Sequence, residues 1–546
     1  MTGRIARTRL APADRPAPAE QLSSQALRAM IEDDDELAIL DVREELTFSR
    51  AHLLHARSAP LSRLELIVPR LVPRHATRII LLDDDDGLAE RAARVLSAHG
   101  YTNLFILAGG VAAWTRAGLV SFSGMHVPSK AFGEVVEHQT GTPSIDAAEL
   151  KRMLERGDDV IVVDSRPFDE FNRISIPSGT NVPGAELVLR LRDLAPSPAT
   201  TVVVNCAGRT RSIIGAQSLI NAGLPNKVMA LRNGTMGWTL AGFAPDHDQQ
   251  RRHALGMPSP TALAWAKAAA ARVGERCGVS RVDLSTVRRW QAESDARTLY
   301  LFDVRDPREY ETDHLPGATS APGGQLVQAT DHYVGTLRAR IVLVDDLECR
   351  AMMTGAWLRQ MGWTEIHVLA ATGSESGWPV QSILGLTERS ADRIDSDVLA
   401  ALIGRNAATV IDLSRSRDYR NGHIRGAWFA IRSRLARAMP KIDARGSIVL
   451  TSEDGVLAAL ALDEAVALTT LPVRYLGGGN AAWAASGRPL TAAEPRLADE
   501  PVDAWLKPYE RSAGDTAAMN EYLSWEIDLP QRIEQDGTCR FHPLLP

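Results

Sequence analysis

A motif that recurs four times along the chain is the strongest constraint on its fold. A strand-like segment ends in an aspartate that a basic residue soon follows; the four aspartates are Asp41, Asp164, Asp303 and Asp412. A run of β-branched and aliphatic residues comes later in each copy. Each copy closes on a Gly-rich turn before a tryptophan; these are Trp114, Trp238, Trp378 and Trp483. Such self-similarity marks repeated structural units, so the sequence predicts four homologous domains.

Within each repeat, short apolar strands alternate with amphipathic helices, which is typical of a parallel sheet covered by helices. We therefore predict an α/β fold with tandem domains over residues 20–122, 140–246, 280–385 and 392–492. Residues 247–279, which are rich in alanine, are predicted to hold a linker helix between two tandem pairs of domains. Residues 500–546 form a C-terminal tail, in which 517–527 are predicted to be a helix that packs its aromatic side chains against a domain.

Composition excludes several classes of function. The chain's 61 basic and 67 acidic residues give a net charge of −6 without long blocks of one sign, so we expect no nucleic-acid partner. No segment approaches the ~20 apolar residues that span a bilayer, and the N-terminus lacks the apolar run of a signal peptide. The four cysteines lie far apart, which argues against disulfides and a zinc site. We expect a cytoplasmic protein without membrane contact, metal or organic cofactor.

The loop that follows the buried strand of each repeat is the expected ligand site, because parallel α/β sheets bind ligands beyond the carboxyl ends of their strands. Aligning the glycine that ends the next helix places Asp83, Cys206 and Asp345 at one position without gaps. In the fourth copy the strand places Ser452 there. Only the second copy therefore has a thiol at this position, and copies one, three and four are predicted to be inactive, with a structural or regulatory role.

Taken together, these features resemble the rhodanese family. The resemblance rests on the Asp-x-Arg strand end, the Pro-Gly-Ala turn at 316–318, a six-residue loop that opens with Cys206, and the Gly-rich turn before tryptophan, and it covers residues 20–490. It implies a central parallel sheet flanked by helices, and transfer of sulfane sulfur from a donor such as thiosulfate. The cysteine would hold the sulfur as a persulfide and pass it to cyanide or a cellular thiol, with an acceptor protein as a further option.

The predicted active site is this loop, with Cys206 as the nucleophile. The residues predicted to bind substrate are Ala207, Gly208, Arg209, Thr210 and Arg211. Loop N–H groups and the following helix N-terminus would attract an anion, and the arginines would favour the thiolate. Two arginines favour a dianion such as thiosulfate over a monocarboxylate. Ser212 is predicted to cap the helix, and Gly208 to let the loop curl.

Two functions other than sulfur transfer fit parts of this pattern. Cysteine phosphatases that share the family's fold have a longer loop, whereas only four residues separate Cys206 from Arg211, so loop length favours sulfur transfer. The second alternative is a scaffold or a persulfide and oxidant sensor, whose repeats bind protein partners. Cys277 and Cys539 are predicted bystanders, and Cys349 a buried apolar residue.

Two recurring features are predicted to be structural, because they also occur in copies that lack the cysteine. Asp164 and Arg166 should brace the fold as an ion pair, and the closing tryptophans should be core residues.

Overall fold

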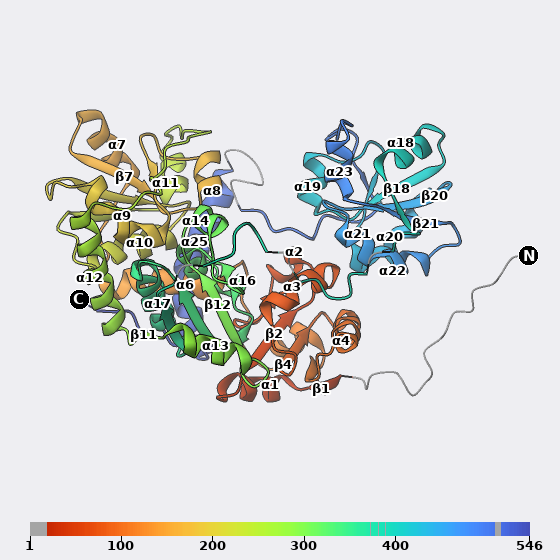
Figure 1. Ribbon diagram of the computed structural model, residues 1–546, viewed down its shortest axis with the longest axis horizontal. Coiled ribbons are helices and arrows are strands. Elements are labelled where there is room, and N and C mark those ends of the chain that lie inside the picture. The colour runs from red at the N-terminus through yellow and green to blue at the C-terminus, as the bar shows by residue number, and fades with distance from the viewer. Residues whose placement is uncertain (1–18, 372, 380–381, 388, 508–514, 546) are drawn as a thin grey trace, which may run out of the picture.

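The computed structural model describes residues 19–371, 373–379, 382–387, 389–507 and 515–545. Over these residues the chain forms four sheets flanked by helices, which confirms the predicted α/β fold of tandem domains (Figure 1). The stretch 1–18, on which the signal-peptide prediction rests, lies outside the described residues. None of the helices in the described part of the chain is long and apolar enough to cross a membrane.

The second domain shows the arrangement that the four domains share. Its parallel strands lie in the order β6 (Ser144–Ile145), β10 (Val228–Leu231), β9 (Thr201–Asn205), β7 (Val160–Asp164) and β8 (Thr180–Asn181). Its helices are α7 (Ala147–Arg156), α8 (Phe168–Arg173), α9 (Leu187–Leu194), α10 (Thr210–Asn221) and α11 (Gly234–Leu240), with the 3₁₀ turn η3 (Gly184–Glu186). The central strand β9 is covered on both faces, which is why 202–204 reads as a continuous run of valine.

The first and fourth domains repeat this plan. The first contains β1 (Glu20–Leu22), α1 (Ser24–Glu32), β2 (Leu37–Asp41), α2 (Glu45–Phe48), β3 (Arg57–Ser58), η2 (Leu61–Arg63), α3 (Leu64–Leu71), β4 (Arg78–Leu82), α4 (Leu88–Ala98), β5 (Leu104–Leu107) and α5 (Gly110–Arg116). The fourth contains β17 (Arg393–Ile394), α18 (Ser396–Gly404), β18 (Ala408–Asp412), α19 (Ser416–Asn421), β19 (Trp428–Phe429), η4 (Arg432–Arg434), α20 (Leu435–Ala438), η5 (Met439–Lys441), β20 (Ser447–Thr451), α21 (Val456–Leu460), α22 (Leu462–Val466), β21 (Val473–Leu476), α23 (Gly479–Ala485) and β22 (Arg496–Leu497).

The third domain departs from the plan at its end. It contains β11 (Ser280–Arg281), α13 (Leu284–Ala292), β12 (Leu299–Asp303), α14 (Pro307–Thr312), β13 (Thr319–Ser320), α15 (Gly323–Gln328), α16 (Thr330–Tyr333), β14 (Thr336–Leu337), β15 (Arg340–Val344), α17 (Cys349–Gln360) and β16 (Ile366–Leu369). Among its described residues no helix follows β16, whereas α5, α11 and α23 follow the matching strands elsewhere.

This departure makes the tryptophan prediction wrong for one copy. Trp114, Trp238 and Trp483 are 1%, 1% and 8% exposed, but Trp378 is 57% exposed. In the other copies two successive residues with positive φ, such as Gly478 and Gly479, start the closing helix. The third copy has alanine and threonine at 371 and 372, residue types that disfavour this conformation. The described residues after β16 therefore form no closing helix, and Trp378 stays exposed.

Two helices outside the repeats bind the second domain to its neighbours. α12 (Pro260–Arg276) lies within 247–279, but it does not act as a spacer: it packs against both α9 and α17. The second and third domains share one apolar core, to which α12 contributes Ala266, Ala269 and Val273. The small alanine side chains let α12 approach its neighbours closely. α6 (Val127–Thr140), which the sequence reading missed, packs against α10, and Gly133 lies against Thr210 in the loop.

The C-terminal tail returns from the fourth domain to the second (Figure 1). Its helix α25 (Thr516–Asp536) packs on α6 and α11 and is longer than the predicted 517–527, because Pro530 lies inside it without ending it. Leu529 and Ile533, beyond the predicted end, are buried against the first domain's Leu54 and Phe122.

Candidate active site

Cys206 lies directly after the central strand β9, and its side chain is 2% exposed. Its Sγ is 3.5 Å from the hydroxyl oxygen of Ser212 in the first turn of α10. Asp83, Asp345 and Ser452 likewise come directly after β4, β15 and β20. The structure therefore places the four aligned residues at the same point of their domains.

The three loops without cysteine at this position show which backbone groups point to it. In the first loop, the N–H groups of Asp85 and Ala89 donate to the Asp83 carboxylate at 2.9 and 3.0 Å. In the third, the Asp345 carboxylate accepts three backbone N–H bonds; the donors are Leu347 (3.3 Å), Arg350 (2.7 Å) and Ala351 (3.2 Å). In the fourth, the N–H of Ala458 donates to the Ser452 hydroxyl at 3.4 Å.

These donors lie two, five and six residues after the first loop position. The equivalent residues in the second loop are Gly208, Arg211 and Ser212. The two aspartates thus occupy, with their own negative charge, the place where the second loop presents Cys206. The loop geometry is that of an anion cradle built from backbone N–H groups at a helix N-terminus. Ser212 is a member that the sequence reading assigned to a different role.

Helix capping and the loop glycine were predicted incorrectly in detail. α10 begins at Thr210 with no side-chain cap, and the Ser212 hydroxyl instead donates to the Arg209 carbonyl at 2.8 Å. Gly208 does not have a positive φ, so it is not needed for a left-handed turn. A Cβ at this residue would lie 2.9 Å from the Met236 methyl group, so its small size matters. Gly234 has φ +53°, and its Cβ would lie 2.3 Å from the Cys206 carbonyl oxygen.

The two predicted anion-binding arginines have different surroundings. The Arg209 guanidinium donates to both carboxylate oxygens of Glu134 at 2.7 Å and also contacts Glu137. Because it is neutralised by two acids of α6, Arg209 ties the loop to that helix. Its guanidinium is thus occupied by protein groups, which does not support the predicted substrate-binding role.

Arg211 lies beside Glu170 of α8, at 2.8 Å, and donates to Gln325 of the third domain at 3.1 Å. Lys507 of the tail is 3.2 Å from the same Glu170. Burial alone would raise the pKa of Glu170, but the charges of Arg211 and Lys507 hold it well below its usual range. Glu170 is therefore ionised, and the three side chains together carry a net charge of +1 near the cradle.

A cavity of about 540 Å³ lies over the loop and is lined by all six predicted site residues. Lys130, Glu170, Gln325, Lys507 and Tyr522 are among its other lining residues, and the sequence reading did not assign any of them to the site. The sequence did contain a signal for Glu170, because a glutamate recurs at the matching position of the third copy, Glu309. In the structure Glu309 pairs with Arg350 at 2.5 Å, as Glu170 does with Arg211 at 2.8 Å. The tail residues had no such internal repeat to reveal them.

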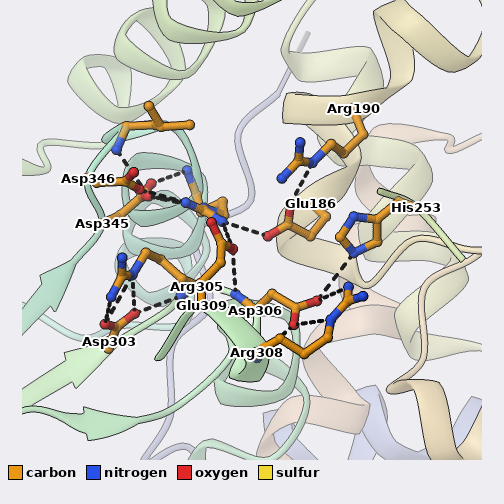
Figure 2. A network of polar contacts seen from close by, with 12 residues as sticks. Glu186, Arg190, His253, Asp303, Arg305, Asp306, Arg308, Glu309, Asp345 and Asp346 are labelled. Atoms are coloured by element: carbon orange, nitrogen blue, oxygen red, sulfur yellow. Dashed lines mark hydrogen bonds and ion pairs between the residues drawn. The ribbon is translucent and has the colours of Figure 1, made fainter. Parts of the chain in front are cut away.

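The third loop is closed by ion pairs. Arg350, which is fully buried, contacts Asp345 (2.9 Å), Asp346 (2.8 Å) and Glu309 (2.5 Å) of its own domain and Glu186 (3.0 Å) of the second. Figure 2 shows Glu186 pointing across the domain boundary toward the Arg350 guanidinium that these carboxylates surround, with Asp306 3.3 Å from His253 nearby. The cradle of this loop is filled by its own Asp345 carboxylate, which takes the N–H bonds that an external anion would need.

Several further residues are predicted to have structural roles. The predicted ion pair of Asp164 and Arg166 is confirmed, with both side chains 1% exposed and a distance of 2.7 Å. Cys349 is fully buried and donates to the Ala266 carbonyl, and burial raises its thiol pKa, as expected of an apolar residue. Cys277 and Cys539 do not line the cavity beside Cys206. No cluster of three or more possible metal ligands occurs in the described ranges.

A cysteine after the central strand of a parallel sheet, facing a cradle of backbone N–H groups, defines an α/β protein with a candidate anion site beside a thiol. The chain matches the family of rhodanese-like domains over residues 23–117, 146–241, 285–376 and 395–486, and it therefore belongs to that family.

Known relatives differ in how much of the chain they share. The crystal structure of thiosulfate sulfurtransferase from Pseudomonas aeruginosa is 45% identical, with a TM-score of 0.93, and the match covers 96% of this chain and 100% of that one. Centrosomal protein of 41 kDa from Xenopus tropicalis is 33% identical over 96 residues, 16% of this chain and 26% of the relative. An HTH-type transcriptional regulator of Mycobacterium tuberculosis is 34% identical over 108 residues, 19% of this chain and 46% of the relative. The chain thus spans about a quarter of the centrosomal relative and under half of the regulator.

Proposed function

We propose that the protein is a sulfurtransferase that moves sulfane sulfur from thiosulfate to a thiophilic acceptor through a persulfide on Cys206. The observation that carries the proposal is that the second loop alone has a thiol where the first and third hold a carboxylate bonded by the loop N–H groups. The likeness over nearly the whole chain to a protein named thiosulfate sulfurtransferase supports this choice of donor.

In the first half-reaction the Cys206 thiolate attacks the outer sulfur of thiosulfate. A bond forms between the two sulfurs, and the sulfur–sulfur bond of thiosulfate breaks, so its electron pair leaves with sulfite. The persulfide that remains on Cys206 is an anion. The N–H groups that correspond to the donors in the first and third loops, those of Gly208, Arg211 and Ser212, would stabilise this charge, because preorganised donors act strongly away from water.

In the second half-reaction an acceptor attacks the outer sulfur of the persulfide. With cyanide, a carbon–sulfur bond forms, thiocyanate leaves, and the electron pair of the broken sulfur–sulfur bond returns to Cys206 as a thiolate. No metal or redox cofactor takes part in this scheme, because each half-reaction exchanges one sulfur between two nucleophiles. Arg211 is positioned to offset the charge of the incoming dianion, with Lys507 beside it.

The test is formation of thiocyanate from thiosulfate and cyanide. We expect turnover by the natural protein and by Cys349→Ser, a matched control that alters a buried cysteine in the third loop, and none by Cys206→Ser. Mass spectrometry of the thiosulfate-treated protein should show an adduct of about 32 Da on the peptide that holds Cys206. Absence of thiocyanate from the natural protein with several donors would reject the enzyme and favour a persulfide or oxidant sensor.

A further inference from the structure

The cavity over Cys206 has walls from every domain and from the tail. Beside the second domain's own residues, its lining includes Glu45 of the first domain, Lys130 of α6, Gln325 of the third domain, Arg417 of the fourth domain, and Lys507 and Tyr522 of the tail. A sulfur-transfer site within one rhodanese-like domain would need none of these contributions. The three copies without a cysteine at the first loop position therefore shape the space in front of Cys206.

The tail helix closes this space over the loop. Glu526 of α25 is bonded to Lys130 of α6 at 2.6 Å and accepts the Tyr522 hydroxyl at 3.0 Å. The Tyr522 ring lies 3.7 Å from where a Cβ on Gly208 would stand, so it is packed against the cradle. Because Cys206 is only 2% exposed below this cover, an acceptor must enter the cavity to reach its sulfur.

The size of the cavity suits a small molecule. Its volume of about 540 Å³ falls in the range of roughly 300–1,000 Å³ that is usual for small-molecule sites. A second cavity of about 520 Å³ adjoins it, and Ala207, Met236, Arg173 and Arg417 line both. A cysteine on the surface of a folded protein would have to bring its backbone into this space to reach Cys206, whereas a small thiol enters it as a whole.

The charge of the walls selects the type of small molecule. Arg417, the first arginine of α19, has its side chain 54% exposed, with Asp418 3.4 Å away, and it lines both cavities. Together with Arg173 it adds positive charge where the two cavities meet. Lysines and arginines outnumber the lining carboxylates of Glu45, Asp169 and Glu170 by six to three, and a cleft with an excess of one sign of charge concentrates ligands of the opposite sign.

We propose that this composite chamber restricts sulfur transfer to small anionic donors and acceptors, excludes the cysteines of folded proteins, and uses Arg417 of the fourth domain as a specificity-determining residue. This inference rests on the proposed function of Cys206. It also gives the fourth domain a role at the active site although its loop position holds Ser452. The acceptor class that fits best is a small thiol that carries a carboxylate, for which glutathione is the probe.

The role of Arg417 is tested by thiosulfate kinetics with cyanide as acceptor. Arg417→Ala should raise KM for thiosulfate by about 3- to 10-fold at low salt, the effect of losing an exposed charge interaction of ~1 kcal/mol, with a smaller change in kcat. In ~1 M salt, where the Debye length is ~3 Å, the difference should disappear. Arg420→Ala removes an exposed arginine from the same helix that does not line either cavity, and it should leave KM unchanged. Equal KM values for both variants would overturn the assignment of Arg417.

Exclusion of protein acceptors is tested on persulfidated protein freed of excess thiosulfate. Glutathione should remove the adduct of about 32 Da, whereas a folded protein with one surface cysteine, at equal thiol concentration, should leave it in place. Removal of the adduct by both acceptors at similar rates would show that the chamber does not exclude protein cysteines, and would overturn that part of the proposal. Cyanide added to a third sample checks the proposed function separately: no adduct, or no thiocyanate, rejects sulfur transfer itself, whereas thiocyanate together with unloading by the protein rejects the chamber alone.

Discussion

Arg350→Met should weaken the joint between the second and third domains without touching Cys206. Arg350 is fully buried and contacts four carboxylates, of which Asp345 and Glu186 are also buried. Removing one partner of a buried ion pair costs ~3–5 kcal/mol. The lower end applies here, because Asp345 keeps its backbone N–H donors and Glu186 keeps Arg190 at 3.0 Å. A loss of ~3 kcal/mol lowers Tm by roughly 6–12 °C if the second and third domains unfold together as a unit of about 150–250 residues.

The loss should depend on pH. Burial would raise the pKa of Asp345 and of Glu186, but the charge of Arg350 holds both below their usual values. Their stabilising effect is therefore present above pH ~4 and is lost as pH falls through the folded-state pKa. Without Arg350 the same groups would favour protonation on folding. The difference between variant and natural protein should thus be largest at neutral pH and shrink as pH falls toward 4.

The assay is thermal unfolding followed by circular dichroism at pH 7 and pH 5, with Arg152→Met as the control. Arg152 forms an ion pair with Glu149 at 2.6 Å on the surface, and its loss should leave Tm unchanged. If the free energy of unfolding of Arg350→Met lies within about 1 kcal/mol of that of the natural protein, the four contacts do not stabilise the joint. An equal loss at both pH values would contradict the electrostatic part of the reasoning.

Three further outcomes are expected. Arg211→Ala should raise KM for thiosulfate at least ~10-fold, the worth of a charge-assisted hydrogen bond, while iodoacetamide still alkylates Cys206; an unchanged KM would remove Arg211 from the site. Gly234→Ala should lower thiocyanate turnover and Tm together, because its Cβ would displace the Cys206 carbonyl at 2.3 Å, and wild-type values of both would contradict this. Burial raises the pKa of Glu44 to about 7, so the free energy of unfolding falls by up to ~3 kcal/mol as pH rises from about 4.5 to 7. Glu44→Gln should remove this pH dependence, which urea unfolding at several pH values measures. A pH dependence that persists in the variant would point to another group.

The repeated motif allowed much of the fold to be predicted, because each landmark had four chances to appear. The shared loop position of Cys206 with Asp83, Asp345 and Ser452 followed from alignment within the chain alone. The recurring Asp-x-Arg pattern also predicted the ion pair between Asp164 and Arg166. These features depend on residues close in sequence or repeated in every copy, so a single chain contains enough information to find them.

What the sequence did not predict depends on contacts between distant segments. Arg209 was expected at the substrate, but Glu134 of α6, 75 residues earlier, holds its guanidinium. Tyr522 reaches the loop from the tail, which has no counterpart in the repeats. Trp378 was expected in the core by analogy, but its turn lacks the residues that tolerate positive φ. Repetition therefore predicted the domains better than it predicted how they combine.

The strand β14 has a consequence for how the protein is made. It belongs to the third domain, yet Thr336 and Leu337 pair antiparallel with Ala38 and Leu37 of β2 in the first. β3 covers only the carboxyl half of the same edge, at Leu40 and Asp41. During synthesis at ~5–20 residues per second, the first domain, complete at residue 122, must wait roughly 10–45 s for this strand. For that time the nascent chain carries an open sheet edge, a template for aggregation that the growing chain later covers from within itself.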